Sequence, residues 1–328
     1  MSWRDYSDWA KTRPTMLRLA EWLGKGRGGT RLLDAINPPP PAPRRPELSG
    51  WERQELAALW IGHATVLLRI GGRTVLADPV FSNRVGIGLG LLTGGPQRLV
   101  KPALSLHELP RLDLVLVSHA HFDHLDRPTL SRLPKRVPVV TSEHNSDLIR
   151  DLGFHSVTEV RWGQRVLVGG LCVTGWPVRH WGARTFIDHH RGYAAFLLEA
   201  EGRRILYGGD TAWGLHFKDV GRVDLAVLGI GAYDPYIAAH ATPEQAWAMA
   251  DHVRADFMLP MHHSTFRLSH EPIHEPLERL LAAAGRSEDR IICREIGQLW
   301  TPDAVATGDR HAGRVPGPDA TVEMRQVC

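Results

Sequence analysis

The stretch "SHAHFDHLD", residues 118–126, places three histidines and two aspartates directly after an apolar run that is typical of a buried strand. His119 and His121 are two residues apart, so in extended backbone their imidazoles project to the same side and can bind one ion. Asp123 and His124 follow where the run "RPTL" begins a helix, so the chain turns and these side chains point to a neighbouring position. One short loop can therefore hold two metal ions.

The ligand types in this loop limit the metals that it would bind. Imidazole and carboxylate groups together suit zinc, and also manganese or iron, and no nearby cysteine favours a softer ion. The alternative is a polar turn whose histidines cap the following helix and hydrogen-bond to solvent, which fits so dense a cluster less well. Asp126 starts that helix, and we expect it to be the N-cap rather than a ligand.

Composition narrows the class of protein. The chain has 328 residues, a formal net charge of +3 and 43% hydrophobic residues, which suits a globular enzyme. No apolar run approaches the roughly 20 residues that cross a bilayer, and no basic block is long enough to suggest nucleic-acid binding. The N-terminus lacks an apolar core after a basic start, so we expect a cytoplasmic location rather than secretion.

The sequence divides into an arm, a large domain and a tail. Residues 1–55 contain an amphipathic segment at 15–23, followed by Gly-rich and Pro-rich stretches, and are expected to form an N-terminal arm. Residues 56–300 are expected to form the domain that carries the metal loop. Residues 301–328, rich in Gly, Pro and Asp, are expected to form a flexible C-terminal tail.

Short β-rich runs alternate with helix-forming segments in the large domain, which indicates a layered α/β fold. Gly71 and Gly72 are expected to join two strands as a hairpin, and Thr242 to cap a helix. Residues 79–110 are predicted to form a loop that borders the site, and "RIICREI" at 290–296 a strand. Several apolar runs, including "ILYGGD" and "FMLPMH", end in polar residues, and function gathers at such strand ends.

Three of these strand ends supply candidate partners for the loop, namely His180, Asp210 and His262. A His-x-His-x-Asp-His loop followed by a distant His, Asp and His in this order resembles the metallo-β-lactamase superfamily, and the match covers residues 60–300. The motifs "WIGHATVLLRIGGRTVLADPVFSNR", "GGPQR", "HWGART", "GDTAW", "GAYDP" and "MHHSTFRLSHEP" resemble the branch of N-acyl-phosphatidylethanolamine-hydrolysing phospholipase D. The ascorbate-6-phosphate lactonase group is a more distant relative.

The resemblance implies a fold and a set of ligands. The fold would be a four-layered αββα sandwich, with two mixed β-sheets packed face to face and helices outside. Two divalent ions are implied, with zinc favoured over manganese or iron. The first ion would bind His119, His121 and His180, the second would bind Asp123, His124 and His262, and Asp210 would bridge them. Such a bridging carboxylate partly offsets the repulsion between two dications.

Each distant residue also has a simpler interpretation. His180 could be an ordinary buried histidine, and Asp210 a turn carboxylate after two glycines. His262 has a competitor, because the branch usually reads Met-His-Trp-Gly-Thr-Phe where this chain has "MHHSTF". His263 and Ser264 replace Trp and Gly there, and position favours His262 as the ligand, with His263 a competitor or a substrate-side donor.

Two further histidines belong to motifs of the branch. His63, in "WIGHAT", lies at a strand junction, where a supporting hydrogen-bonding group is expected more often than a ligand. His240 falls where the branch places a histidine before a Pro-Glu helix start, facing the substrate cleft. For His240, a role in the reaction and a role in capping the helix are weighted equally.

The resemblance implies a hydrolase, and within it a phosphodiesterase of phospholipase D type. A hydroxide that bridges the two metals would attack an N-acyl-phosphatidylethanolamine-like or other phosphodiester, with Asp210, Asp123 and His240 as catalytic groups. A lactonase or other ester hydrolase on a soluble substrate would use the same ligands. A non-catalytic metal-binding protein is the third interpretation, and the filled ligand positions argue against it.

Partners follow from the substrate class. A phospholipid substrate would require peripheral contact with a membrane. The apolar stretch at 85–93 and the arm are candidate contacts, and the arm contributes Trp3, Trp9, Leu17, Leu19 and Trp22. Packing of these segments on the domain, or on a second subunit of a homodimer, is weighted somewhat above lipid contact.

Overall fold

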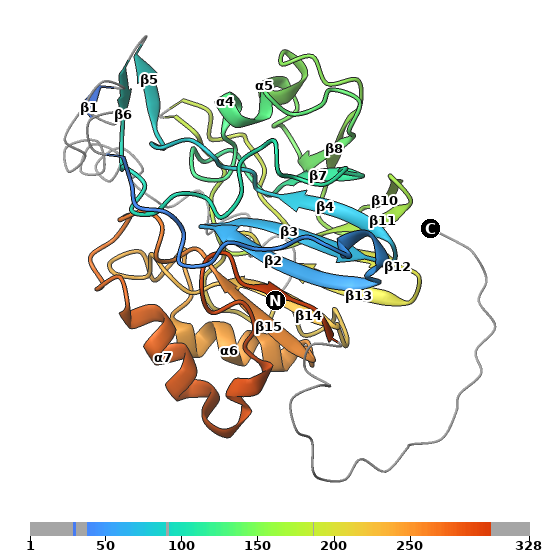
Figure 1. Ribbon diagram of the computed structural model, residues 1–328, viewed down its shortest axis with the longest axis vertical. Coiled ribbons are helices and arrows are strands. Elements are labelled where there is room, and N and C mark those ends of the chain that lie inside the picture. Colours follow the sequence, from blue (N-terminus) through green and yellow to red (C-terminus); the bar gives the residue numbers. More distant parts are fainter. Residues whose placement is uncertain (1–28, 31–37, 90–91, 186, 303–328) are drawn as a thin grey trace.

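Two β-sheets packed face to face form the centre of the molecule (Figure 1). The computed structural model describes residues 29–30, 38–89, 92–185 and 187–302. The first sheet has seven strands, in the spatial order β16 (Leu299–Trp300), β2 (Leu56–Gly62), β3 (Thr65–Ile70), β4 (Arg73–Ala77), β7 (Leu114–Val117), β8 (Val139–Ser142) and β9 (Val157–Val160).

The first sheet combines a local hairpin with parallel strands. Strands β3 and β4 pair antiparallel across the predicted two-residue turn, where Gly71 and Gly72 have φ of 52° and 72°. Both glycines adopt the left-handed conformation that this turn requires. From β4 through β7 and β8 to β9 the pairing is parallel, so the carboxyl ends of these strands lie at one edge of the sheet.

The second sheet has six strands and is also mixed. Its spatial order is β10 (Arg165–Val168), β11 (Leu171–Trp176), β12 (Ala195–Ala200), β13 (Arg203–Tyr207), β14 (Leu225–Gly229) and β15 (Phe257–Met261). The first four strands pair antiparallel, and β13, β14 and β15 pair parallel. The parallel half therefore presents its carboxyl ends together.

Side-chain alternation along the strands builds the layers. Val66 and Leu68 of β3 lie with Phe196 and Leu198 of β12 in one fully buried apolar cluster between the sheets. The intervening Leu67 faces the other way, into a second cluster on the outer face of the first sheet. Because strand side chains alternate between faces, each sheet buries apolar residues on both sides.

Helices cover both outer faces, which confirms the expected four-layered αββα sandwich (Figure 1). On the first sheet lie η1 (Trp51–Arg53), α4 (Arg127–Leu130) and α5 (Asp147–Arg150), and on the second α6 (Pro243–His252) and α7 (Glu275–Ala284), with η2 (Gly285–Arg290) after it. Thr242 caps α6 as predicted, since its hydroxyl accepts from the N–H of Gln245, whose side chain accepts from the N–H of Thr242.

The loop predicted at 79–110 contains regular structure of its own. Within it, β5 (Ile87–Leu89) and β6 (Leu92–Gly94) pair antiparallel, and β1 (Gly29–Thr30), from outside the loop, pairs with β6 to complete a small three-stranded sheet. The apolar stretch at 85–93 is thus largely a hairpin, although no period in its sequence indicated one.

The prediction of a strand at residues 290–296 was wrong. Only Ile291 forms a bridge, to Met258, and Cys293 has a φ of 51°, which breaks an extended backbone. The predicted segment at 15–23 and the tail from residue 303 lie outside the described residues. None of the helices in the described ranges has the length and apolar character that crossing a bilayer requires.

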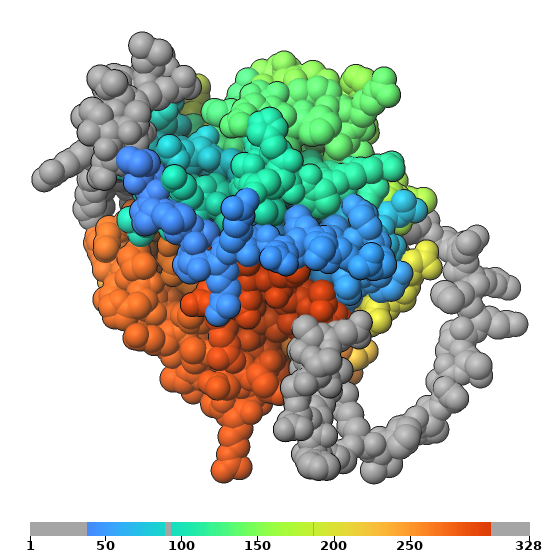
Figure 2. Space-filling view, in the orientation of Figure 1, coloured from blue at the N-terminus to red at the C-terminus, as the bar shows by residue number. Residues whose placement is uncertain are grey.

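The described part of the predicted arm lies against the domain. Residues 38–55 run across the surface beside the segment around residues 290–300 (Figure 2). The N–H of Arg44 donates to the carbonyl of Ile296 at 3.2 Å, and Trp51 is only 2% exposed. These residues therefore belong to the packed structure.

Candidate metal centre

The proposed ligands come from the carboxyl ends of strands in both sheets. The metal loop, residues 118–126, follows β7 of the first sheet. His180 comes shortly after β11, Asp210 after β13 and His262 directly after β15, all in the second sheet. Residues more than fifty positions apart in sequence are therefore brought together where the two sheets meet.

One group of four side chains can hold a first ion: His119, His121, His180 and Asp210 offer one ligand atom each within 4.8 Å of one another. Nδ1 of His121 lies 2.9 Å from Nε2 of His119 and 3.3 Å from Nε2 of His180. Ligand atoms held at about 2.0–2.1 Å by one tetrahedral ion lie about 3.3 Å apart. The spacing of these nitrogens therefore fits a single divalent ion.

A second group lies beside the first: His63, Asp123, His124 and His262 meet the same criterion. Oδ2 of Asp123 lies 2.9 Å from Nε2 of His63, 3.3 Å from Nε2 of His262 and 3.7 Å from Nε2 of His124. Three of these four residues are the ones expected at the second ion.

Asp210 lies between the two groups. Its Oδ2 atom is 3.2 Å from Nε2 of both His124 and His262, which belong to the second group. The same atom is 3.6 Å from Nε2 of His180 and 3.8 Å from Nε2 of His119, which belong to the first. A carboxylate oxygen at this position can contact two ions at once.

Burial and neighbouring charges shift the pKa values of the ligand side chains. Burial opposes ionisation of Asp123 and Asp210, but the surrounding histidines hold the pKa of both carboxyl groups well below the usual range. Burial is also the main reason why the pKa of His121 falls to about 4 and that of His180 to about 3. These two histidines are therefore neutral at pH 7, the form that binds metals. Burial lowers the pKa of His262 as well, but the carboxylates of Asp210 and Asp123 raise it to about 9, and cations in place of that ring proton would satisfy the same carboxylates.

Buried atoms without protein partners test whether the residues fit a metal. Nε2 of His124, Nε2 of His262 and Oδ1 of Asp210 are fully buried, and no hydrogen bond satisfies them among the described residues. Nε2 of His124 faces the carboxylates of Asp210 and Asp123 instead. Buried polar groups are costly unless they are paired. Divalent cations at the two groups would pair them, so the donor set fits metal binding.

The opposite ring nitrogens of several histidines are held by hydrogen bonds. Nδ1 of His124 lies 2.6 Å from Oδ2 of Asp78, and Nδ1 of His180 lies 3.0 Å from the carbonyl of Ala239. Metal-binding histidines ordinarily have such partners, which fix the tautomer. The sequence prediction did not include Asp78, although it directly follows the strand β4, which pairs in parallel with β7, and that position was the available signal.

His63 provides the contact expected of a supporting group, through Nε2 and the carboxylate of Asp123. Its backbone has a φ of 55° and is fastened on both sides: its N–H donates to Thr265 Oγ1, and its carbonyl accepts from the N–H of His262. The His63 side chain also lies within the second ligand group, so it could bind the ion directly, the role that the sequence analysis ranked below a supporting one.

His240 lies at the edge of the cluster. Its Nδ1 is 3.9 Å from Oδ2 of Asp210, and these residues form a third group of metal-ligating type with His262. Because Thr242 forms the capping box of α6, His240 is not the helix cap. Of the two roles weighed for His240, its position favours one beside the metals.

Two other sequence predictions concern the neighbours of the ligands. His263 belongs to neither group: its ring lies against Trp60, with ring centroids 4.5 Å apart, and its Nδ1 is 2.8 Å from Ser264 Oγ. Asp126 occupies the N-cap position of α4, as predicted. Its carboxylate accepts from the hydroxyl of Thr129 and joins no ligand group.

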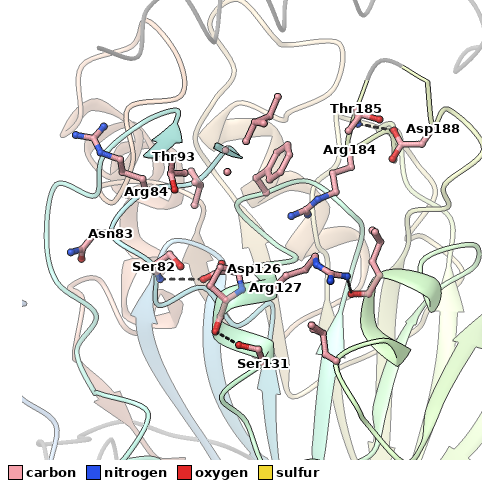
Figure 3. A pocket seen from close by; sticks show the side chains of 18 of the residues that line it. Ser82, Asn83, Arg84, Thr93, Asp126, Arg127, Ser131, Arg184, Thr185 and Asp188 are labelled. Carbon is pink, nitrogen blue, oxygen red and sulfur yellow. Dashed lines mark hydrogen bonds between the residues drawn. The ribbon is translucent and has the colours of Figure 1, made fainter. Parts of the chain in front are cut away.

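A cavity of about 1180 Å³ opens beside the metal loop (Figure 3). Its wall includes Phe122 of that loop, and apolar side chains from three other segments: Val85, Ile87, Leu148, Leu152 and Ile187. Its charged residues are Arg84, Arg127, Arg184, Arg191, Asp126 and Asp188. The cavity therefore combines an apolar surface with four arginines and two aspartates, and two of these arginines, Arg127 and Arg191, are also paired with Asp151 and Asp147 outside its wall.

Arg184 connects this cavity with the metal loop. Its Nη1 donates to the carbonyls of Ala120 at 2.7 Å and Leu125 at 2.8 Å, and its guanidinium lies 3.9 Å from the ring centroid of Phe122. Burial is the main reason why the pKa of Arg184 falls to about 10. One cation thus holds both ends of the ligand-bearing segment.

Comparisons with known proteins agree with this geometry. Residues 73–263 match the family model described as the β-lactamase superfamily domain. The chain is 35% identical over 267 residues to an uncharacterized protein of Mycobacterium tuberculosis, covering 76% of this chain and 70% of that protein. It is 31% identical over 272 residues to N-acyl-phosphatidylethanolamine-hydrolyzing phospholipase D 1 of Caenorhabditis elegans, covering 75% of each.

A solved structure supports the fold alone. The isothiocyanate hydrolase from Delia radicum gut bacteria aligns with a TM-score of 0.58 at 20% identity, covering 72% of this chain and 94% of that one. The family match and the sequence identity carry the assignment. The chain therefore belongs to the metallo-β-lactamase superfamily, as a metal-dependent hydrolase that resembles its N-acyl-phosphatidylethanolamine-hydrolysing phospholipase D branch.

Proposed function

We propose that this protein is a phosphodiesterase of phospholipase D type that works with two divalent metal ions. The observation that carries the proposal is the position of Asp210, whose Oδ2 faces nitrogen ligands of both groups. Two-metal sites suit phosphodiester hydrolysis because they stabilise charge on both the attacking and the leaving oxygens.

Seven side chains would hold the ions. His119, His121 and His180 would bind the first, and Asp123, His124 and His262 the second, with Asp210 shared. Ions at these positions would lower the pKa of a water toward neutrality and neutralise charge on the phosphoryl oxygens. Zinc suits the nitrogen-rich first group, and manganese or iron would be accepted by the same ligands.

The chain's own groups would orient the reactants. The buried carboxylates of Asp210 and Asp123 can accept hydrogen bonds from an attacking water and so align it with phosphorus. His240, at the edge of the cluster, can donate a hydrogen bond to an oxygen of the substrate. Arg184 would hold the loop that carries Asp123 in place through its hydrogen bonds to the carbonyls of Ala120 and Leu125.

The cavity beside the loop supports an amphiphilic substrate. Ligand sites are mostly apolar with a few polar groups, and this cavity has that character (Figure 3). An anionic phosphodiester with acyl chains would match its arginines and its apolar wall. The nematode relative, whose name states that it hydrolyses N-acyl-phosphatidylethanolamine, supports the same substrate class. Access to such a lipid would bring the protein to a membrane surface from the cytoplasm.

A substrate panel tests the proposal. Protein loaded in turn with zinc, manganese and iron is assayed against bis-p-nitrophenyl phosphate, vesicles containing N-acyl-phosphatidylethanolamine, and simple lactones. We expect hydrolysis of the two phosphodiesters, lost on chelation and restored by metal. Turnover of lactones alone would replace the proposal with an ester hydrolase. No hydrolysis of any of these substrates by protein with two bound ions would identify a metal-binding protein without catalysis.

A further inference from the structure

We infer that Glu271 is a positioning residue that holds the loop of residues 231–241, and through this loop His180 of the first ligand group. The inference rests on the two-metal centre proposed above. Glu271 is 7% exposed and belongs to none of the ligand groups. It lies between β15 and α7, whereas the 231–241 loop connects β14 with α6. Its contacts therefore join two separate segments beside the metal centre.

The carboxylate of Glu271 binds the backbone of the 231–241 loop. Oε1 accepts from the N–H of Ala232 at 2.6 Å, and Oε2 accepts from the N–H of Asp234 at 3.2 Å. The hydroxyl of Ser269 also donates to Oε1, at 2.6 Å. Both oxygens of a carboxylate can only accept hydrogen bonds, so they suit these three donors. The first half of the loop is therefore fastened to Glu271 by its main chain.

The backbone of Ala232 depends on this support. Its φ is 64°, in the left-handed region that an alanine rarely adopts. Such a conformation costs free energy and persists where the surrounding structure imposes it. The N–H of Ala232 is the group that donates to Glu271 at the shorter distance. Without the carboxylate, we expect Ala232 to relax toward a negative φ and to redirect the chain that follows it.

A hydrogen-bonded turn carries such a displacement toward the metal centre. The carbonyl of Tyr236 accepts from the N–H of Ala239 at 2.8 Å and from that of His240 at 3.0 Å. Residues 236–240 therefore move together. The loop ends beside Asp210, where the N–H of Ala241 donates to the carbonyl of Thr211 at 2.8 Å.

The carbonyl of Ala239 determines which nitrogen of His180 can bind an ion. It lies 3.0 Å from Nδ1 of His180 and can only accept, so Nδ1 carries the proton of the neutral ring. Nε2 keeps its lone pair, and lies 3.3 Å from Nδ1 of His121 and 3.6 Å from Oδ2 of Asp210. Glu271 thus supports the first ion through the loop, without touching a ligand.

The histidines of the second ligand group are held by other segments. Nδ1 of His124 lies against Asp78, and the N–H of His262 donates to the carbonyl of His63. Displacement of the 231–241 loop leaves these contacts in place. The two ions should therefore respond differently to the loss of Glu271.

Substitution of Glu271 by glutamine keeps its size and removes one acceptor. The amide nitrogen can only donate, so the N–H of either Ala232 or Asp234 loses its partner. Loss of a partner that orients a metal-binding histidine ordinarily lowers metal affinity by about 10–100-fold. Glu271→Gln should therefore weaken the first ion by about 10-fold or more and leave the second within about 3-fold.

Asp224→Asn is the matched control. The carboxylate of Asp224 also accepts through both oxygens, from the N–H of Arg204 at 2.7 Å and from the side chain of Arg203 at 3.1 Å. Asp224 precedes β14, whereas the 231–241 loop follows the other end of this strand. Its substitution removes an equivalent acceptor without displacing the loop, so both ions should be retained.

The experiment measures metal binding rather than turnover. Full-length protein and the variants Glu271→Gln, Glu271→Asp and Asp224→Asn are titrated with Zn²⁺ against a chromophoric chelator, and the bound ions are counted by mass spectrometry. Glu271→Asp keeps the carboxylate but shortens its reach. The variant His180→Gln identifies the binding step of the first ion, because it removes a ligand of that ion alone.

The expected result is selective. Glu271→Gln should weaken the step that His180→Gln abolishes, and Asp224→Asn should weaken neither step. Unchanged affinity at that step, or equal weakening of both steps, would overturn the inference. If Glu271→Gln does not fold, Glu271→Asp is judged by the same two outcomes. An unmodified protein that binds two ions but hydrolyses no phosphodiester would overturn the phosphodiesterase alone. Fewer than two ions in that protein would overturn the two-metal centre and this inference with it.

Discussion

Oδ2 of Asp210 lies 3.2 Å from Nε2 of His262, although the two residues follow strands that β14 separates. Since the same oxygen faces His119 of the other group, we expect Asp210→Asn to release metal and to lower kcat/KM for a phosphodiester by more than about 100-fold. Asp219→Asn, at an exposed position, is the control and should keep full activity. Full activity in Asp210→Asn would remove the bridging role.

The contribution of the Arg184 hydrogen bonds to the metal loop can be measured as a free energy of unfolding. Arg184→Met would leave the carbonyls of Ala120 and Leu125 without their donor, and we expect a loss of about 2–4 kcal/mol in the free energy of unfolding. Arg127→Met removes an arginine from the same cavity wall that donates to one carbonyl, that of Leu148, and pairs with the exposed Asp151, and should cost less, about 1–2 kcal/mol. Equal losses in urea denaturation of the two variants would contradict the special role of Arg184.

Close backbone packing at Gly231 holds the His262 segment in place. A Cβ at Gly231 would lie 2.3 Å from the carbonyl oxygen of His262, so Gly231→Ala must displace one of the two backbones. We expect this variant to bind less than the full complement of metal and to lose activity. Gly94→Ala is the control because a Cβ there meets only the carbonyl oxygen of Ile87, at an ordinary distance of 3.9 Å, and Gly94 does not line the cavity. Unchanged metal content in Gly231→Ala would show that this segment can shift without affecting His262.

Acid sensitivity is expected from His216, which is buried outside the ligand set. Burial is the main reason why its pKa falls from 6.5 to about 3. The unfolded chain takes up a proton at this position as pH falls below 6.5, whereas the folded protein does not, so stability is lost from pH 6.5 downward. Between pH 7.5 and 5 this single group contributes a loss of about 2 kcal/mol.

The variant His216→Gln isolates that contribution. Its free energy of unfolding in urea should change less between pH 7.5 and 5 than that of the unmodified protein, by about 2 kcal/mol. Comparison of the two proteins cancels the effect of the other histidines. Parallel pH profiles would show that His216 is protonated equally in the folded and unfolded states.

The architecture was predictable because its signals are local. The hairpin at Gly71 and Gly72, the cap at Thr242 and the dense metal loop each depend on residues within a few positions of one another. The segment at 290–296 has equally strong β-forming residues, but Cys293 has a positive φ and the carbonyl of Ile296 accepts from the N–H of Arg44 instead of from a strand. Local propensity is overridden there by tertiary packing.

The hydrogen bonds of Asp78 were not predicted because they depend on sheet topology, and only its position after a strand was a signal in the sequence. Asp78 and Ser118 are 40 residues apart and become neighbours only because β4 and β7 pair in parallel. In the sequence, Asp78 precedes a proline, and an Asp-Pro pair reads as an ordinary turn. Tyr207 reaches the same carboxylate from the opposite sheet, and no sequence spacing indicates that contact.

The division of the ligands between the two sheets has a consequence for the unfolding of the protein. The metal loop belongs to the first sheet, whereas His180, Asp210 and His262 belong to the second. Ions bound between these ligands would link the two sheets at one end of the sandwich and oppose their sliding or separation. Binding to the folded form stabilises it by mass action. Metal supply would therefore govern the lifetime of the folded chain as well as its chemistry.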